Sequence, residues 1–145
     1  MAFAAAALSP AGCAQFGRGE ANPIAGSWSL TRNVVTRTDG TRTDVFGTDP
    51  KGIALFSPDG YFAVVNTKAS LPKFAAGNRM QGTAAENQAV VQGSIALYGT
   101  YSVDPSTNTL SLNINSSTWP SWTGTSQKRV YVLNGDELSW TLAAS

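Results

Sequence analysis

The sequence predicts an all-β protein: an antiparallel β-barrel of about eight strands with one short helix near its open end. Three observations point to this fold. Hydrophobic residues make up 42% of the 145 residues and charged residues only 13%, so uncharged polar residues must cover most of the surface of a single domain. Several short segments alternate between apolar and polar residues, as half-buried strands do. Residues that form turns separate these segments at regular spacing.

The first strand is predicted within Ser27–Arg37. Trp28 and Leu30 share one face of this segment, while Ser29 and Thr31 share the other, which is the two-residue period of a strand with one buried side.

A hairpin is predicted next, and it is the strongest local signal in the chain. Lys51–Ser57 and Tyr61–Thr67 are rich in β-forming residues, and a Ser-Pro-Asp-Gly turn joins them. Pro58 sets the backbone for the second turn position, and Gly60 accepts the left-handed conformation at the end of the turn.

The segment from Thr67 to Ser94 interrupts the β pattern and contains the predicted helix. Thr83 and Glu86 have the spacing of a capping box, in which each side chain bonds the backbone near the other residue. A helix can therefore follow over Ala84–Gln92. Because so short a helix is not stable alone, we expect it to pack on another part of the protein.

The second half of the chain returns to strands. A loop rich in Trp, Pro, Ser and Gly at Ser117–Thr125 and a hairpin turn at Asn134-Gly135 lie among them. The predicted strands are Ile95–Val103, Thr109–Ser116, Gln127–Leu133 and Glu137–Leu142.

The first 23 residues are predicted to be a signal-like or flexible segment ahead of a barrel domain over residues 24–145. Met1–Leu8 is rich in Ala, Phe and Leu, and small residues follow it, as in a secretory signal peptide. Small residues also precede Cys13, which is compatible with a lipid anchor. An Ala-rich tail without a targeting role is the alternative. We therefore expect an exported protein, periplasmic or secreted, and a cytoplasmic one if Met1–Ala14 is not a signal.

The residue types that are missing exclude several functions. The chain has no histidine, which removes histidine-based catalysis and most zinc and other transition-metal sites. Its single cysteine cannot form an intrachain disulfide. The net charge is +1 and the ten basic residues are scattered, so nucleic acid is not expected as a partner. No apolar run approaches the ~20 residues of a transmembrane helix. We expect no cofactor and no metal, and the balance favours a protein that is not an enzyme.

The order and spacing of several short segments resemble those of the lipocalin-like domain family, a group of small bacterial and fungal β-barrel proteins. The resemblance runs from about Ile24 to Leu142 and implies a small barrel that holds a ligand; a few relatives in natural-product pathways are thought to isomerise or cyclise intermediates. The segments that carry it are Ile24–Leu30, Phe46–Gly47, Asp49–Gly52, Phe56–Tyr61, Phe74–Gly77, Tyr98–Tyr101, Trp119–Thr125 and Gln127–Arg129.

The resemblance also implies how one end of the barrel is closed. Gly26 and Trp28 match the Gly-x-Trp opening of lipocalins, in which the tryptophan covers the narrow end of the barrel. An arginine from a late strand lies over that ring in such proteins, and Arg129 is the candidate here. An ordinary core tryptophan is the alternative for Trp28.

The candidate ligand-binding residues are the aromatic, cationic and flexible side chains predicted to lie inside the barrel or at its open end. Tyr98 and Tyr101 have opposite parity on their strand, so only one of them can point inward. The two loop tryptophans either form a rim that contacts an apolar ligand or fold back to seal the barrel. The irregular segment before the helix is either a lid or a solvated loop. The candidates are Phe62, Phe74, Arg79, Met80, Tyr98, Tyr101, Trp119 and Trp122.

Three functions follow from these observations. The first is a binding protein that encloses a small hydrophobic or amphipathic molecule in the barrel. The second is an isomerase or cyclase without a metal, which acts on a hydrophobic substrate of the natural-product type. The third is a structural envelope protein whose barrel is filled by its own side chains.

Overall fold

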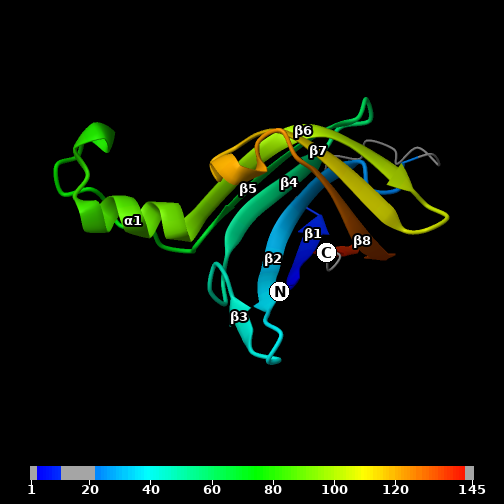
Figure 1. The fold of residues 1–145 in the computed structure, drawn as a ribbon, viewed down its shortest axis with the longest axis horizontal. Coiled ribbons are helices and arrows are strands. Elements are labelled where there is room, and N and C mark those ends of the chain that lie inside the picture. The colour runs from blue at the N-terminus through cyan, green and yellow to red at the C-terminus, as the bar shows by residue number, and fades with distance from the viewer. Residues whose placement is uncertain (1–2, 11–21, 143–145) are drawn as a thin grey trace.

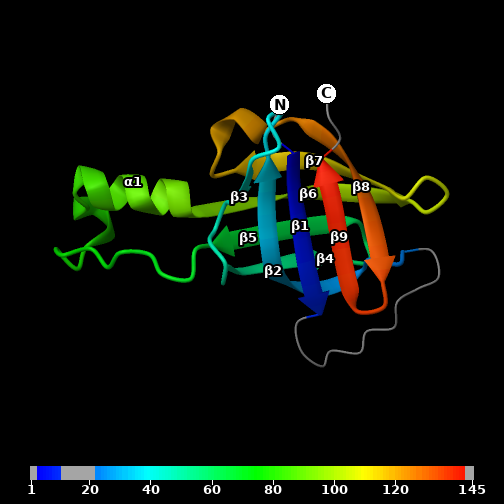
Figure 2. The ribbon, with the colours of Figure 1, turned by 90° about the horizontal axis from the view of Figure 1, so that it is seen from below.

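The protein is an antiparallel β-barrel with a helical arm at one side (Figures 1 and 2). The structure is a computed structural model, and it describes residues 3–10 and 22–142. One helix, α1 (Ala84–Gly93), and two short 3-10 turns, η1 (Arg79–Gln81) and η2 (Pro120–Trp122), lie between strands. The strands are β1 (Phe3–Pro10), β2 (Gly26–Thr36), β3 (Arg42–Asp44), β4 (Lys51–Phe56), β5 (Tyr61–Thr67), β6 (Ser94–Asp104), β7 (Thr109–Ser117), β8 (Ser126–Asn134) and β9 (Glu137–Leu142).

Eight of these strands form a closed ring. The sheet runs in the order β1-β9-β8-β7-β6-β5-β4-β2, and β1 also pairs with β2. The short strand β3 pairs with the far end of β2, beyond the part that pairs with β4. Closure leaves no unpaired strand edge inside the ring, which protects the backbone from pairing with other chains. The predicted barrel of about eight strands is confirmed, while β3 was not predicted.

The strand that closes the ring comes from the segment predicted to be a signal. Phe3–Pro10 pairs antiparallel with β2 on one side and with β9 on the other. A short apolar run without charges fits a strand as well as it fits the core of a signal peptide, so composition alone does not separate the two. Export stays a prediction, and Cys13, the predicted lipid-anchor residue, lies outside the described residues.

The predicted turns and the predicted helix cap are confirmed. Gly60 has φ = +93° at the end of the β4–β5 turn, and Gly135 has φ = +58° in the β8–β9 turn. Both values lie in the region that only glycine adopts freely. At the start of α1, the amide of Glu86 donates to the Thr83 hydroxyl and the amide of Thr83 donates to the Glu86 carboxylate.

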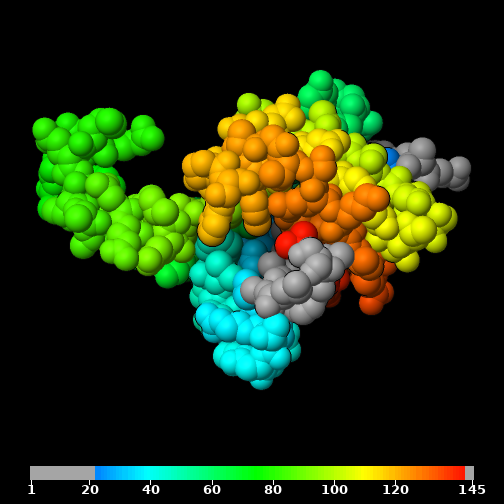
Figure 3. Space-filling model, viewed as in Figure 1, coloured from blue at the N-terminus to red at the C-terminus, as the bar shows by residue number. Residues whose placement is uncertain are grey.

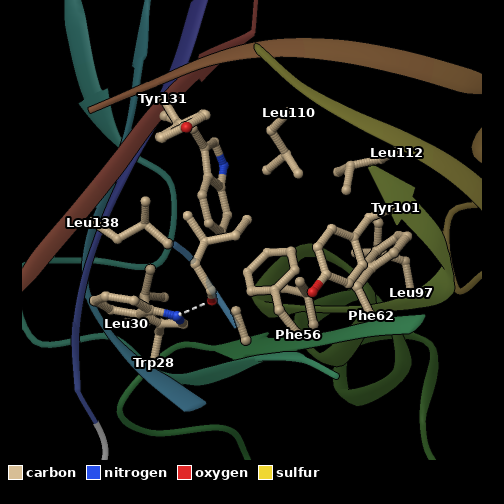
Figure 4. Close-up of a cluster of buried hydrophobic side chains, with 14 of the residues drawn as sticks. Trp28, Leu30, Phe56, Phe62, Leu97, Tyr101, Leu110, Leu112, Tyr131 and Leu138 are labelled. Carbon is tan, nitrogen blue, oxygen red and sulfur yellow. Dashed lines mark hydrogen bonds between the residues drawn. The ribbon is translucent and has the colours of Figure 1, made fainter. Parts of the chain in front are cut away.

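One end of the barrel, which we call the base, is filled by the protein's own side chains. Trp28 is 1% exposed, and its Nε1 donates a 2.8 Å hydrogen bond to the carbonyl oxygen of Ile24, itself fully buried. Figure 4 shows this bond beside a dense cluster of apolar side chains. The buried members include Ile24, Trp28, Leu30, Phe56, Phe62, Leu97, Tyr101, Leu110, Leu112, Ile114, Tyr131, Leu138 and Trp140.

Aromatic edge-to-face packing holds the middle of this cluster. The Phe56 ring lies 5.0 Å from Tyr101 and 5.9 Å from Trp140, with interplanar angles of 70° and 87°. The Tyr101 hydroxyl donates to the carbonyl oxygen of Ser57 at 2.7 Å and accepts from the Asn22 amide at 2.5 Å. Such pairs stabilise a fold by ~0.5–1.5 kcal/mol beyond the area they bury.

The segment expected to be a lid or a solvated loop is part of a projecting arm. Residues 68–83 and α1 leave the barrel between β5 and β6 and extend sideways from it in both ribbon views (Figures 1 and 2). Gly93, at its junction with β6, is the buried residue of α1. Instead of packing on the barrel, the arm is held by its own contacts: the Glu86 carboxylate accepts from the amide of Ala75 at 2.9 Å, and the Asn87 amide donates to the Gly82 carbonyl.

We predict that Trp28 contributes far more to stability than an exposed tryptophan does. Replacing Trp28 with alanine should lower the free energy of unfolding by ~3–5 kcal/mol, because a large cavity remains in the base. Replacing Trp119, which is 57% exposed, should change it by about 0.5 kcal/mol or less. Denaturant titration measures both values, and a loss for the Trp119 variant as large as that for the Trp28 variant would contradict the assignment of the base.

Candidate functional site

The end of the barrel opposite the base, which we call the mouth, carries the candidate site. Figure 3 faces this end, with the η2 segment in orange and the β2–β3 hairpin in cyan on two sides of it. Three partly buried side chains, Val45, Ile95 and Trp122, pack against the core from the segments that border the mouth. These side chains therefore mark the boundary of the packed core at this end.

The η2 segment is held rigidly across the ends of β7 and β8. The amide of Gly124 donates to the carbonyl of Ile114 at 2.8 Å, and the Thr125 hydroxyl donates to the carbonyl of Trp122 at 2.7 Å. Gly124 adopts φ = +77° to make this turn, a conformation that suits glycine. The segment thus fixes both loop tryptophans, as its Pro and Gly residues predict.

The two loop tryptophans form a stacked pair that leads from solvent toward the interior. Their ring centroids are 6.2 Å apart, with an interplanar angle of 29°. Trp119 is exposed, whereas Trp122 is partly buried against the core. Trp119 therefore fits the interpretation of an exposed rim, and Trp122 fits that of a residue that folds back to seal the barrel.

Arg129 continues this line of aromatic rings into the barrel. Its guanidinium carbon lies 6.0 Å from the centroid of Trp122 and 5.8 Å from that of Trp140, a buried residue of β9. On β8 the burial pattern alternates, and Gln127, Arg129 and Tyr131 are on the less exposed face. A cation therefore sits among indole rings on the interior face of the sheet.

The guanidinium of Arg129 has little polar compensation. One Nη2–H donates to Gln127 Oε1 at 2.7 Å, but Nε is shielded from solvent and has no hydrogen-bond partner. The ion pairs in the described part of the chain, Arg32–Asp44 and Lys51–Asp49, are elsewhere on the surface. Burial lowers the pKa of Arg129 to about 10, so the group keeps its charge at neutral pH.

Burial of the Arg129 charge is costly, and two kinds of contact offset that cost. Cation–π contacts contribute ~0.5–2 kcal/mol each, the larger values where the cation is desolvated, and the charge-assisted bond to Gln127 adds to them. The guanidinium still lacks an acid partner, and its Nε lacks an acceptor.

This geometry corrects the role expected of Arg129. The guanidinium lies over Trp122 and Trp140 rather than over Trp28, because residue 129 is set toward the mouth, opposite Leu142 of β9, while Trp28 lies in the base. Gly26 does open β2 with φ = +134°, as a sharp entry into the strand requires.

The remaining candidates from the sequence lie in three separate places. Phe62 and Tyr101 face inward but belong to the packed core. Tyr98 is 54% exposed and faces outward, so of the two tyrosines on β6 only Tyr101 points into the barrel. The candidates Phe74, Arg79 and Met80 are on the arm, and Met80 is 83% exposed. The structure brings only Trp119 and Trp122 together at the mouth.

Sequence reasoning missed Asn66 as an interior polar group. This β5 residue is 6% exposed, and its Oδ1 has no hydrogen-bond partner. It lies over Gly52, where a Cβ would come within 2.4 Å of that oxygen. The signal was available in the sequence, because Phe62, Val64 and Asn66 share one parity and the first two are apolar.

A separate apolar depression of about 430 Å³ lies away from the mouth. It is lined by the start of β2 and by the β4–β5 hairpin, with Leu55, Phe56 and Pro58 among its residues. Tyr101, the nearest buried tyrosine, bonds to Ser57 and Asn22, and burial raises the pKa of its hydroxyl. The depression therefore presents apolar surface and no group suited to proton transfer.

No group of three metal-ligating side chains occurs among residues 3–10 and 22–142. No helix in that part of the chain is long and apolar enough to cross a membrane.

Comparison with known proteins gives one match. The family model described as a lipocalin-like domain matches residues 25–145. No curated protein and no solved structure matches the chain.

We predict that the order of the arm depends on the Glu86 carboxylate. The amides of Ala75 and Thr83 bond to it and lower its pKa, so its contribution is present at neutral pH and is lost as the pH falls through that lowered pKa. Hydrogen exchange at Ala75 should then accelerate, and the variant Glu86→Ala should exchange fast at pH 7. Unchanged protection of Ala75 in that variant would show that other contacts order the arm.

We also predict that Arg129→Met raises the stability of the ligand-free protein. Methionine fills a similar volume without the desolvation cost of a charge, and replacing buried charges with apolar side chains is often neutral or stabilising, so we expect a gain of about 1 kcal/mol. Denaturant titration measures the change. A loss of 1 kcal/mol or more would mean that the two rings stabilise the cation more than burial destabilises it.

Proposed function

The chain belongs to the lipocalin-like domain family, and on this basis we propose that it binds a small hydrophobic or amphipathic molecule through the mouth of its barrel. One observation carries the proposal: an unbroken line of groups, Trp119, Trp122, Arg129 and Trp140, runs from solvent into the interior. Ligand sites combine apolar and aromatic walls with a few polar groups that orient the ligand. This line offers both.

The exposed ring supports the proposal on energetic grounds. Trp119 leaves 57% of its surface in water although a rigid turn holds it in place. An exposed tryptophan on a fixed turn gains no burial energy for the fold, whereas it contributes a large contact area to a ligand at little entropic cost. Its stacking on Trp122 extends that area toward the barrel.

The two other functions have less support. A purely structural barrel agrees with the filled base, but it does not account for a partly buried cation that faces inward without an acid partner. An isomerase or cyclase needs a donor or base free to act on a substrate, and the inward-facing Tyr101 is committed to Ser57 and Asn22. Binding without catalysis therefore remains the function that the geometry supports best.

A neutral apolar probe tests the proposal. N-phenyl-1-naphthylamine should bind the wild-type protein saturably and gain fluorescence. The variant Trp119→Ala should bind about 2- to 10-fold more weakly, as expected for the loss of an aromatic contact of ~0.5–1.5 kcal/mol.

Leu55→Ala is the matched control, since Leu55 is an exposed apolar residue that lines the separate depression. Its affinity for the probe should equal that of the wild type. Weaker binding by the Leu55 variant alone would move the site to the depression. Absence of saturable binding by the wild type would favour the purely structural barrel.

A further inference from the structure

We propose that the ligand is an anionic amphiphile whose carboxylate enters the barrel first and pairs with the guanidinium of Arg129. The inference rests on the proposed function and adds the charge and the orientation of the ligand. It assigns to Arg129 a binding role in the interior of the barrel, in place of a role in closing the base.

The charge of the site is the first argument. Arg129 is a cation inside the barrel, flanked by Trp122 and Trp140, and the ion pairs of the described chain are elsewhere. A buried charge without a counterion is costly, and an apolar residue would pack there at lower cost. A ligand anion would supply the missing countercharge and remove the cost.

The free donors of Arg129 are the second argument. An arginine has five N–H groups in a planar fork, and the structure assigns one of them to Gln127. Nε–H has no acceptor either, but protein atoms shield it from contact. A carboxylate that approaches from the mouth can therefore accept end-on from the two terminal nitrogens, a bidentate geometry in which arginine binds carboxylates strongly.

The apolar path supplies the orientation. From Arg129 outward, the groups in line are Trp122 and then Trp119, and Ile95 is a further apolar side chain packed against the core. A head group at Arg129 therefore leaves an aliphatic tail to run along indole surfaces toward solvent. The base is filled by its own side chains, so the tail has no comparable path in the other direction.

Isothermal titration with three ten-carbon probes separates the charge of the ligand from its apolar body. Decanoate, decan-1-ol and decylammonium share a tail and differ in the head group. The wild type should bind decanoate at least ~10-fold more tightly than decanol, and decylammonium more weakly than either, because a charge-assisted bidentate pair forms only with the anion.

Two variants test whether Arg129 is the source of the preference. Arg129→Met should bind decanoate and decanol with equal affinity. Arg79→Met removes the same charge from an exposed position on the arm and should keep the wild-type preference. The comparison of probes on the wild-type protein needs no variant, so the proposal can be tested even if Arg129→Met fails to fold.

The outcomes distinguish the two proposals. Equal binding of decanoate and decanol by the wild type overturns the anionic ligand and leaves the proposed function intact. A preference for decanoate that persists in Arg129→Met, or disappears in Arg79→Met, overturns the role of Arg129. Failure of all three probes to bind overturns the proposed function itself.

Discussion

The filled base, built around Trp28, determines what the rest of the barrel can do. Its indole is buried and bonded to the carbonyl of Ile24, so the chain that leads into β2 is fixed beneath the barrel. Phe56, Tyr101 and Trp140 pack edge to face above it. Because these side chains fill the interior at the base, a ligand that enters the barrel must do so from the opposite end. The polar groups near the mouth are therefore the candidates for contact with a ligand inside the barrel.

Arg129 is the group whose presence the fold itself does not require. Packing alone would favour an aliphatic side chain at this inward-facing position of β8, since it would fill the space beside the two indoles without desolvating a charge that lacks an acid partner. A residue that costs stability at one defined place is typical of a functional site. The exposed Trp119 is its counterpart at the surface, held by the rigid turn without stabilising the core. Together they account for the mouth as a site for an amphipathic molecule.

The sequence predicted the local structure well because alternation and turn chemistry act over a few residues. The Ser57–Gly60 turn, the Thr83 cap and the opposite facing of Tyr98 and Tyr101 are all local properties. The partners of Arg129 could not be predicted in this way. The alternation along β8 places Arg129 on the inward face. How far Arg129 lies from the mouth depends on the register between β8 and β9.

Two larger features also escaped prediction for physical reasons. The segment Phe3–Pro10 is apolar and uncharged, so its composition fits an export signal and a barrel strand equally. The arm projects because Glu86 and Asn87 satisfy its backbone internally, and α1 presents no apolar face that would draw it onto the barrel. Of the two roles expected for Phe74, Arg79 and Met80, a lid or a solvated loop, the arm is therefore closer to the second.

The central claim is that a ligand carboxylate meets Arg129 inside the barrel, and the Nε–H of that residue reports on it directly. In ¹⁵N-edited NMR spectra, the Arg129 Nε–H resonance, assigned by its loss in Arg129→Met, should shift when decanoate binds. This is expected because a carboxylate that bonds to the terminal nitrogens redistributes charge over the whole guanidinium, Nε included. Decan-1-ol should leave the resonance close to its ligand-free position. An unchanged resonance under saturating decanoate, with binding established by titration, would contradict the account.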